Sequence, residues 1–180
     1  MKINLRRVTT GAVLIAAASA FLFCTGFTKA SDHGNHENGY LKSATYYSDD
    51  WVINFWNSES SHMDEELKQI REDGFNSIIL VVPWREFQPS MAPEHYNDYA
   101  WEKFDRVMKA AKAQDLKVML RVGYTWDYYS SENVLARYEK LLYDSETKKA
   151  WLHYAKRLYE KASAYDNFSG GFITWEDFWN

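Results

Sequence analysis

The stretch of sequence that decides the fold is GFNSIILVVPW, residues 74–84. Its centre, residues 77–82, is an unbroken run of β-branched and aliphatic side chains after one serine, which is typical of a strand buried on both faces. Gly74 is placed to end a preceding helix, and Pro83 ends the strand. A strand of this kind belongs to a parallel sheet covered by helices, so strands and helices are expected to alternate on either side of it.

The rest of the chain shows that alternation. Apolar side chains at helical spacing predict helices around 63–70 and 101–111, and over 132–142 and 145–165. Short β-rich runs predict strands at 52–55, 116–122 and 172–174, in addition to 77–82. The resulting β-α-β-α-β-α-β order calls for a parallel sheet with right-handed crossovers.

Two architectures fit this order, a doubly wound open sheet and the first half of an eightfold β/α barrel. Open-sheet nucleotide binders usually carry a glycine-rich turn after the first strand, whereas residues 56–59 contain no glycine. Aromatic and charged residues instead follow the predicted strands, at the rim where barrels build their active sites. These residues are Trp56, Trp84, Arg85, Glu86, Arg121, Tyr124, Trp126, Asp127, Trp175, Glu176 and Asp177. The sequence therefore predicts an α/β fold of the (β/α)8 TIM-barrel type with only the first four strands present, a half barrel.

Composition excludes several classes of function. The chain has a formal net charge of −4, and residues 1–30 hold four basic and no acidic side chains. The remaining 150 residues therefore carry 17 basic against 25 acidic side chains, a net charge of −8, which argues against nucleic acid as a partner. The only cysteine, Cys24, excludes disulfides and thiolate sites from the rest of the chain.

The first thirty residues have the layout of a secretory signal peptide. A basic start is followed by an apolar run of about fourteen residues and by a small-x-small site at 28–30, which predicts cleavage after Ala30. The alternative is a retained anchor, but a membrane-spanning helix needs about 20 apolar residues. We therefore expect a bacterial protein that is secreted or held at the cell surface, with membrane contact only through the uncleaved signal peptide.

Residues 31–48 have no apolar period and are interpreted as a flexible leader, with the barrel half over 49–180. The two histidines and two carboxylates of the leader are the kind of side chains that bind a metal. Solvated linkers often contain such residues, so no metal and no cofactor are expected.

Four segments together resemble a known family: INFW (53–56), GFNSIILVVPWREFQP (74–89), LKVMLRVGYTW (116–126) and GGFITWEDFW (170–179). They are similar to strands one to four of the clan A glycoside hydrolases, β/α-barrel enzymes that cleave β-linked sugars with retention of configuration. The resemblance implies that Glu176 is the general acid/base, at the end of the fourth strand. It places the nucleophile, a second Glu, at the end of a seventh strand beyond Asn180. The chain departs from the family at Trp175, where an Asn is usual, and at Ile79, near the place of a common Arg.

The chemistry of such a site is consistent with Glu176. Retaining cleavage needs two carboxyls about 5–5.5 Å apart, and apolar surroundings keep the acid protonated. Glu176 is flanked by Trp175 and, beyond Asp177, by Phe178 and Trp179. Two alternatives remain open: Asp177 acts as the acid or orients Glu176, or Glu176 is an ordinary strand-end carboxylate.

Sugar rings stack on aromatic side chains, and the candidates for substrate binding are Trp56, Trp84, Tyr124, Trp126 and Trp179, together with the polar or flanking residues Arg121, Asp127, Trp175 and Asp177. Trp101 and Trp151 lie on helical stripes and are expected in the core. Arg121, on a buried strand, is interpreted either as a ligand to a sugar or a catalytic carboxylate, or as a structural ion-pair partner of Asp49, Asp50 or Glu86.

Two functions from different classes follow. One is an exported glycoside hydrolase-like protein acting on a β-linked poly- or oligosaccharide by a retaining two-carboxylate mechanism. In this form the 180-residue chain alone is expected to be inactive, because it lacks the nucleophile. The other is a non-catalytic carbohydrate-binding or interaction protein built on a half barrel. In either form, open sheet edges are expected to favour self-association.

Overall fold

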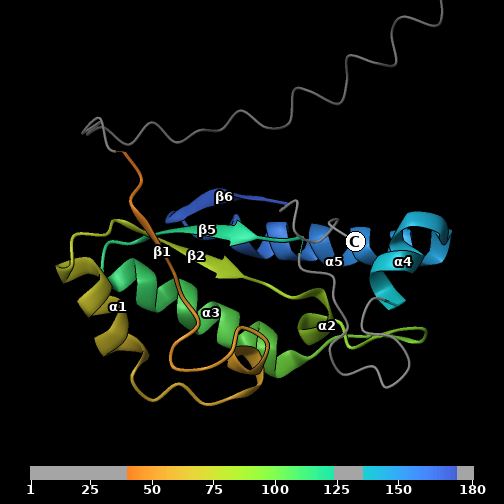
Figure 1. Ribbon diagram of the computed structural model, residues 1–180, viewed down its shortest axis with the longest axis horizontal. Coiled ribbons are helices and arrows are strands. Elements are labelled where there is room, and N and C mark those ends of the chain that lie inside the picture. The colour runs from red at the N-terminus through yellow and green to blue at the C-terminus, as the bar shows by residue number, and fades with distance from the viewer. Residues whose placement is uncertain (1–39, 124–135, 174–180) are drawn as a thin grey trace, which may run out of the picture. The chain divides into compact units, whose positions relative to one another are not determined.

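The computed structural model describes residues 40–123 and 136–173 (Figure 1). The strands are β1 (Ser43–Thr45), β2 (Ser77–Val81), β3 (Ser90–Met91), β4 (Glu94–His95), β5 (Lys117–Arg121) and β6 (Phe168–Phe172). The helices are the 3-10 helix η1 (Asn54–Asn57) and the α-helices α1 (Met63–Glu72), α2 (Trp84–Phe87), α3 (Asp98–Ala113), α4 (Ala136–Tyr143) and α5 (Ser145–Ala162).

The main sheet has four parallel strands in the order β1-β2-β5-β6, which is also their order along the chain. A doubly wound sheet needs a point where the strand order reverses. This sheet has none, because each new strand adds to the same side of the previous one, as in a β/α barrel. The prediction of a half barrel is confirmed.

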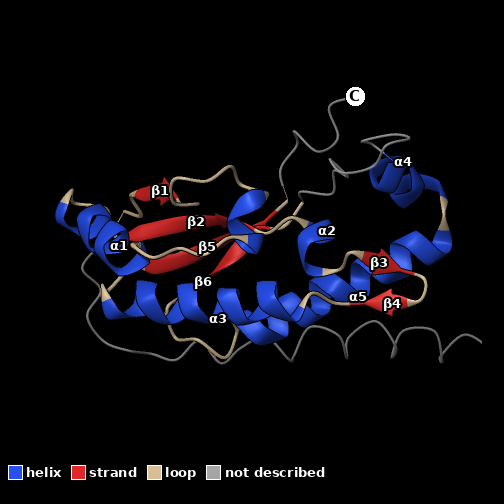
Figure 2. Ribbon diagram, turned by 90° about the horizontal axis from the view of Figure 1, so that it is seen from below, coloured by secondary structure: helices blue, strands red, loops and turns tan. Residues whose placement is uncertain are grey.

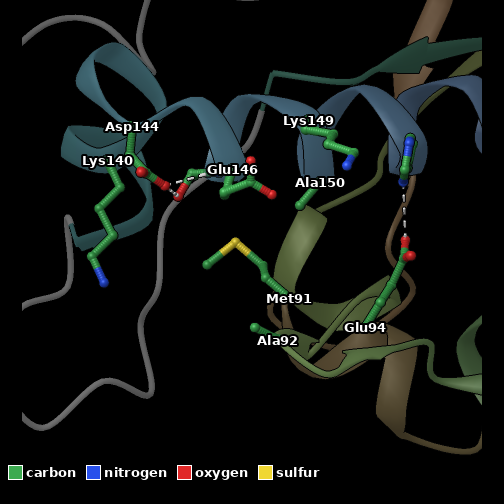
Figure 3. Close-up of a pocket in the computed structure, with 10 residues that line it drawn as sticks. Met91, Ala92, Glu94, Lys140, Asp144, Glu146, Lys149 and Ala150 are labelled. Carbon is green, nitrogen blue, oxygen red and sulfur yellow. Dashed lines mark hydrogen bonds and ion pairs between the residues drawn. The ribbon is translucent and has the colours of Figure 1, made fainter.

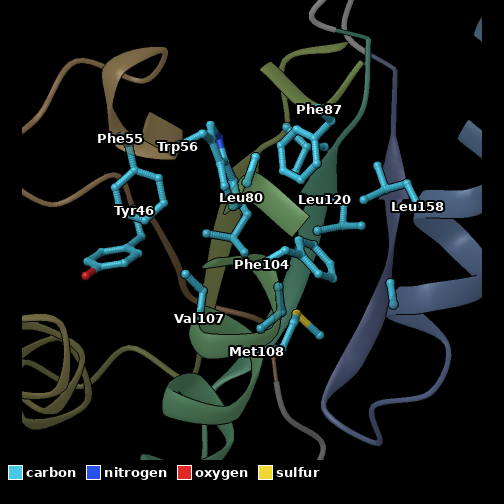
Figure 4. Packing of buried hydrophobic residues seen from close by; sticks show 14 of the residues in the cluster. Tyr46, Phe55, Trp56, Leu80, Phe87, Phe104, Val107, Met108, Leu120 and Leu158 are labelled. Carbon is cyan, nitrogen blue, oxygen red and sulfur yellow. The ribbon is translucent and has the colours of Figure 1, made fainter. Parts of the chain in front are cut away.

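Helices cover one face of this sheet, and the hydrophobic core lies between the two layers (Figures 2 and 4). Leu80 of β2 and Leu120 of β5 are fully buried in this core. They pack among side chains that α3 and α5 contribute, which include Phe104, Met108 and Leu158. The prediction that Trp101 and Trp151 belong to the core is also confirmed, since Trp101 is buried and Trp151 packs against the core cluster.

The alternate residues of the strands lie on the opposite face, which corresponds to the interior of a closed barrel. Ile79 of β2 and Met119 and Arg121 of β5 are only half-buried there. Phe172 of β6 is 37% exposed. Val52 and Ile53 pack against this inner face at Val81. Apart from such loop contacts, no layer of helices or strands covers it among the described residues.

The predicted first strand is wrong, and the reason is local packing. Residues 54–57 form η1, and the first strand is β1, within the segment predicted as a leader. Val52 and Ile53 look like strand residues but are buried against Val81 instead. The compact unit that holds the sheet accordingly begins at Tyr40 rather than at residue 49.

The predicted fourth strand, 172–174, begins too late. The strand β6 starts at Phe168, and Gly170 and Gly171 lie inside it rather than before it. A Cβ atom on Gly171 would overlap the Tyr159 hydroxyl of α5 and would lie 2.9 Å from the carbonyl oxygen of Leu120. Helix α5 therefore packs against β6 at a distance that only glycine allows.

Replacing Gly171 by alanine should lower the free energy of unfolding by about 1–3 kcal/mol, because the added methyl overpacks the contact between α5 and β6. Thermal or urea denaturation measures this loss. Ser169→Ala is the matched control, since Ser169 is exposed on the same strand and should change stability little. Equal stability of the two variants would show that the helix moves away from the strand without cost.

Candidate functional site

The four parallel strands end at one common edge of the sheet. At this edge Val81 of β2 pairs with Arg121 of β5, which in turn pairs with Phe172 of β6. The segments that follow the strands are the loop with η1 after β1, helix α2 with the β3–β4 hairpin after β2, and helix α4 after β5 (Figure 1). In β/α barrels this carboxyl edge carries the active site.

Most of the predicted site residues lie outside the described residues: Tyr124, Trp126, Asp127, Trp175, Glu176, Asp177 and Trp179. The structure does describe strands β5 and β6, which lead to these residues. Strand β6 ends with Phe172 at the carboxyl edge, where Val122 donates its N–H to the carbonyl oxygen of Phe172 at 2.9 Å. Arg121 is half-buried as the last residue of β5, on the inner face of the sheet.

The predicted stacking roles of Trp56 and Trp84 are corrected by the structure. Both indoles are fully buried, so neither has a free face for a sugar. The Trp56 indole N–H donates to the carbonyl oxygen of Val81 at 2.9 Å, and its ring lies edge-on to Phe87 with 4.6 Å between centroids. Trp84 stacks on Tyr154 with 6.5 Å between centroids. The physical reason is that η1 and α2 fold back over the core instead of extending into solvent.

Two exposed aromatic residues of the edge were missed. Trp51 is 59% exposed and Tyr47 is 37% exposed, and both lie in the loop after β1. The misplaced first strand hid them, because a strand at 52–55 would put both residues at its amino end. With β1 at its actual position they belong to the carboxyl edge.

The loop after β1 is fixed by contacts on both sides of Trp51. The Tyr46 hydroxyl and the Ser48 hydroxyl each donate to the Glu66 carboxylate at 2.7 Å. On the other side, the Phe55 N–H donates to the carbonyl oxygen of Trp51 at 3.0 Å. The backbone that carries the exposed indole is therefore held by hydrogen bonds to α1 and η1.

Glu86 is a second residue of interest at this edge. The residue is 7% exposed, and its carboxylate accepts a hydrogen bond from the Asn57 side-chain amide. Burial raises the pKa of Glu86, while the hydrogen bond from Asn57 and the charges of Arg85 and Arg137 oppose this shift. The Asn97 amide donates both to the Asn57 side-chain oxygen and to the Glu86 carbonyl oxygen at 3.0 Å. Glu86 thus ties η1, α2 and the start of α3 together.

A cavity of about 620 Å³ lies between the β3–β4 hairpin and the first turns of α5 (Figure 3). Its lining mixes both charges with an apolar floor: Met91, Ala92, Glu94, Lys140, Asp144, Glu146, Thr147, Lys149, Ala150 and His153. The Nδ1 atom of His153 lies 3.6 Å from the Glu94 carboxylate across it. The Glu94 carboxylate also accepts from the Gln88 amide at 2.9 Å, which links the hairpin to the end of α2.

Residues 40–123 and 136–173 contain no helix long and apolar enough to cross a membrane. Within the same ranges, no three His, Cys, Asp or Glu side chains gather in a way that would hold a metal ion.

The order of the four parallel strands and their common carboxyl edge define the class of fold, which is the four-stranded half of a β/α barrel. No family model matches the chain, and no curated protein matches it in sequence. Solved structures do match. A GH5_18 protein from Bifidobacterium longum subsp. longum, in complex with Manb1-4GlcNAc, has a TM-score of 0.60 and 20% sequence identity. The match covers 74% of this chain and 33% of that one.

Two further matches are similar. A GH5_18 protein from Streptomyces cattleya in complex with GlcNAc has a TM-score of 0.59 at 19% identity, with 72% of this chain and 32% of that chain covered. The exo-beta-1,4-mannosidase Op5Man5 from Opitutaceae bacterium strain TAV5 has a TM-score of 0.56 at 18% identity, with 68% and 22% covered. The chain thus spans about a third or less of the structures that it resembles, and the resemblance to clan A glycoside hydrolases is confirmed at the level of the fold.

Proposed function

We propose that the chain is the amino-terminal half of an exported glycoside hydrolase-like protein that acts on a β-linked oligo- or polysaccharide. The observation that carries this proposal is the sheet order, β1-β2-β5-β6 without reversal, with every strand ending at one edge. The fourth strand of the series, β6, ends at Phe172, four residues before Glu176. That spacing supports Glu176 at the rim, in the position that the family uses for its general acid/base.

The proposed mechanism is retaining. Glu176 protonates the leaving oxygen while a second carboxylate attacks the anomeric carbon, and Glu176 then deprotonates the water that releases the sugar. The resemblance assigns the second carboxylate to a seventh strand, so the reaction needs the other half of a barrel. Arg121, on the inner face at the same edge, is suited to bind an anionic or hydroxyl partner there.

The proposed substrate is a β-1,4-linked oligosaccharide that contains mannose. This choice rests on the ligand and activity named for the similar structures, Manb1-4GlcNAc and exo-beta-1,4-mannosidase. The acidic balance of the chain supports an uncharged sugar over an anionic one.

The test is calorimetric titration of the full chain with Manb1-4GlcNAc and with longer β-1,4-linked manno-oligosaccharides, followed by product analysis. We expect saturable binding without hydrolysis by these 180 residues, because the family resemblance places the second carboxylate on a seventh strand, outside them. An α-linked disaccharide of mannose is the control and should bind more weakly. Absence of binding to every β-linked sugar would contradict the proposal.

The alternative, a non-catalytic carbohydrate-binding half barrel, predicts the same binding. The two functions separate when this chain is joined to a second barrel half that carries a Glu at the end of its third strand. Hydrolysis by the joined protein supports the enzyme, whereas binding without hydrolysis supports the alternative.

We also propose that the chain self-associates. Strands β1 and β6 each pair with a single neighbour among the described residues, and the inner face between them is half-exposed. Unpaired strand edges and apolar surface of this kind promote association. Light scattering after size-exclusion chromatography should find a dimer or larger species; a monomer with a sharp, cooperative unfolding transition would contradict this prediction.

Export through residues 1–30 is the last part of the proposal. The exported protein should begin at Ser31, because the small-x-small site at 28–30 precedes it. Mass spectrometry of the secreted fraction measures this. A protein that begins at Met1 or Lys2 would favour a retained anchor instead.

A further inference from the structure

We propose that Trp51, with Tyr47 in the same loop, is a sugar-stacking platform at the carboxyl edge of the sheet. This inference rests on the proposed function and deepens it, because it assigns a binding residue outside the four motifs that carry the family resemblance. The ligand is one pyranose unit of a neutral β-linked oligosaccharide.

The exposure of Trp51 sets it apart from the tryptophans that build the core. Trp56 and Trp84 are fully buried and Trp101 is 3% exposed, whereas 59% of Trp51 is open to solvent. Single exposed hydrophobic residues are common in proteins and carry little meaning by themselves. The position of Trp51 and the way its loop is held provide the further arguments.

The position follows from the packing of the next two residues. Val52 and Ile53 are buried against Val81, the last residue of β2. Val81 alternates with Ile78 and Leu80, which face the helices, so Val81 lies on the inner face of the sheet. The loop therefore folds over the inner face at its carboxyl end and presents Trp51 at the mouth of the half barrel.

The loop is held in place while the indole stays free. Besides the bonds to Glu66 and the Phe55 N–H, the Ser58 hydroxyl donates to the Asp50 carboxylate. The Asp50 N–H donates to the carbonyl oxygen of Tyr47 at 3.3 Å, which closes a turn between the two aromatic residues. A platform fixed before the ligand arrives loses less conformational entropy on binding than a mobile one.

The chemistry around the indole suits a neutral sugar. A pyranose presents a flat face of C–H groups that packs on an aromatic ring, and its hydroxyls bond to carboxylates. Asp49 and Asp50 directly precede Trp51, and Asp49 is exposed. Their negative charge disfavours phosphates, sulfates and uronic acids at this place.

The platform and the proposed acid/base follow different strands. Trp51 follows β1 and Glu176 follows β6 along the chain, and these are the two outer strands of the sheet. We therefore expect a sugar on Trp51 to occupy a subsite that does not flank the cleaved bond. Such a subsite contributes equally to the binding of substrate and transition state. In an active barrel, loss of this subsite would raise KM and leave kcat nearly unchanged.

The experiment compares Trp51→Ala, Trp51→Phe and Tyr40→Ala in the full chain. Tyr40 is 85% exposed, and it precedes β1 and therefore lies at the opposite edge of the sheet, which makes it the matched control. Binding of Manb1-4GlcNAc and of longer β-1,4-linked manno-oligosaccharides is measured by calorimetry. Thermal denaturation and size-exclusion chromatography are measured in parallel.

We expect Trp51→Ala to weaken binding of the longer sugars about tenfold, Trp51→Phe to retain most of the affinity, and Tyr40→Ala to match the unaltered chain. All melting temperatures should agree, because the indole is largely outside the core. Unchanged affinity in Trp51→Ala, with sugar still bound, would overturn this inference and leave the proposed function standing. A change of oligomeric state in Trp51→Ala without a change of affinity would also overturn it, since Trp51 would then be an interface residue. If the unaltered chain binds none of these sugars, both this inference and the proposed function are overturned.

Discussion

Replacing Lys103 by methionine should lower the free energy of unfolding at pH 7 by about 1–3 kcal/mol. Lys103 is fully buried on α3, and its ammonium donates to the carbonyl oxygens of Phe55 and, at 2.8 Å, of Ser58. It also lies 3.9 Å from the centre of the Phe55 ring. Methionine fills a similar volume without a donor. The Phe55 and Ser58 carbonyl oxygens would lose the charged donor and keep only the hydroxyls of Ser58, at 3.4 Å, and of Tyr99, at 2.8 Å.

The pH dependence of stability provides a second measurement on the same side chain. Burial lowers the pKa of Lys103 to about 8, from an ordinary value of 10.5. Between these two values the unfolded chain binds the proton more tightly than the folded one, so this side chain makes stability rise with pH from about 8 to about 10. Urea denaturation at pH 7, 8, 9 and 10 should show this rise in the unaltered chain and not in Lys103→Met.

The control is Lys109→Met, which removes an exposed ammonium from the same helix and should change neither stability nor its pH dependence much. The comparison is kept at or below pH 10, because burial raises the pKa of Tyr46 and Tyr154 and their effect opposes that of Lys103 at higher pH. If Lys103→Met is as stable as the unaltered chain, the Ser58 and Tyr99 hydroxyls are sufficient donors for these carbonyl oxygens, and Lys103 does not hold the loop.

Lys103 also shows where sequence reasoning reaches its limit. The period of apolar residues around 101–111 correctly predicted a helix, which the structure extends to Asp98–Ala113. Strands β2 and β5 were predicted to within a residue or two, because long apolar runs between turn residues leave little choice. No local signal, however, shows that a lysine of this helix reaches carbonyl groups more than forty positions away.

The errors at the candidate site have two origins, the position of the first strand and the burial of residues after the strands. Strand β1 is only three residues long and lies in a polar segment, whereas the β-branched pair Val52 and Ile53 a few residues later imitates a strand. A first strand at 52–55 would place Trp51 at the amino edge of the sheet, whereas β1 at Ser43–Thr45 places it at the carboxyl edge. Sequence position likewise placed Trp56 and Trp84 after strands, but burial depends on where η1 and α2 turn, which local pattern does not specify.

In a polypeptide that joins this chain to the other half of a barrel, Glu176→Gln should reduce kcat on unactivated β-glycosides by several powers of ten. The amide cannot give a proton to the leaving oxygen. The family resemblance assigns this role to no carboxyl among the described residues. Aryl glycosides with good leaving groups need little protonation, so the first step should lose less with them. Steady-state kinetics on both kinds of substrate, with binding measured separately, tests this pattern.

Azide and a neighbouring variant give the decisive controls. If Glu176 is also the base of the second step, azide should restore turnover of an aryl glycoside by Glu176→Gln and yield a glycosyl azide of retained β configuration, because the anion attacks the covalent intermediate without base assistance. Asp177→Asn removes the adjacent carboxylate and should reduce activity far less. If instead Glu176→Gln keeps the rate on unactivated substrates while Asp177→Asn loses it, Asp177 is the acid. Glu176 would then be a structural carboxylate at the end of the fourth strand.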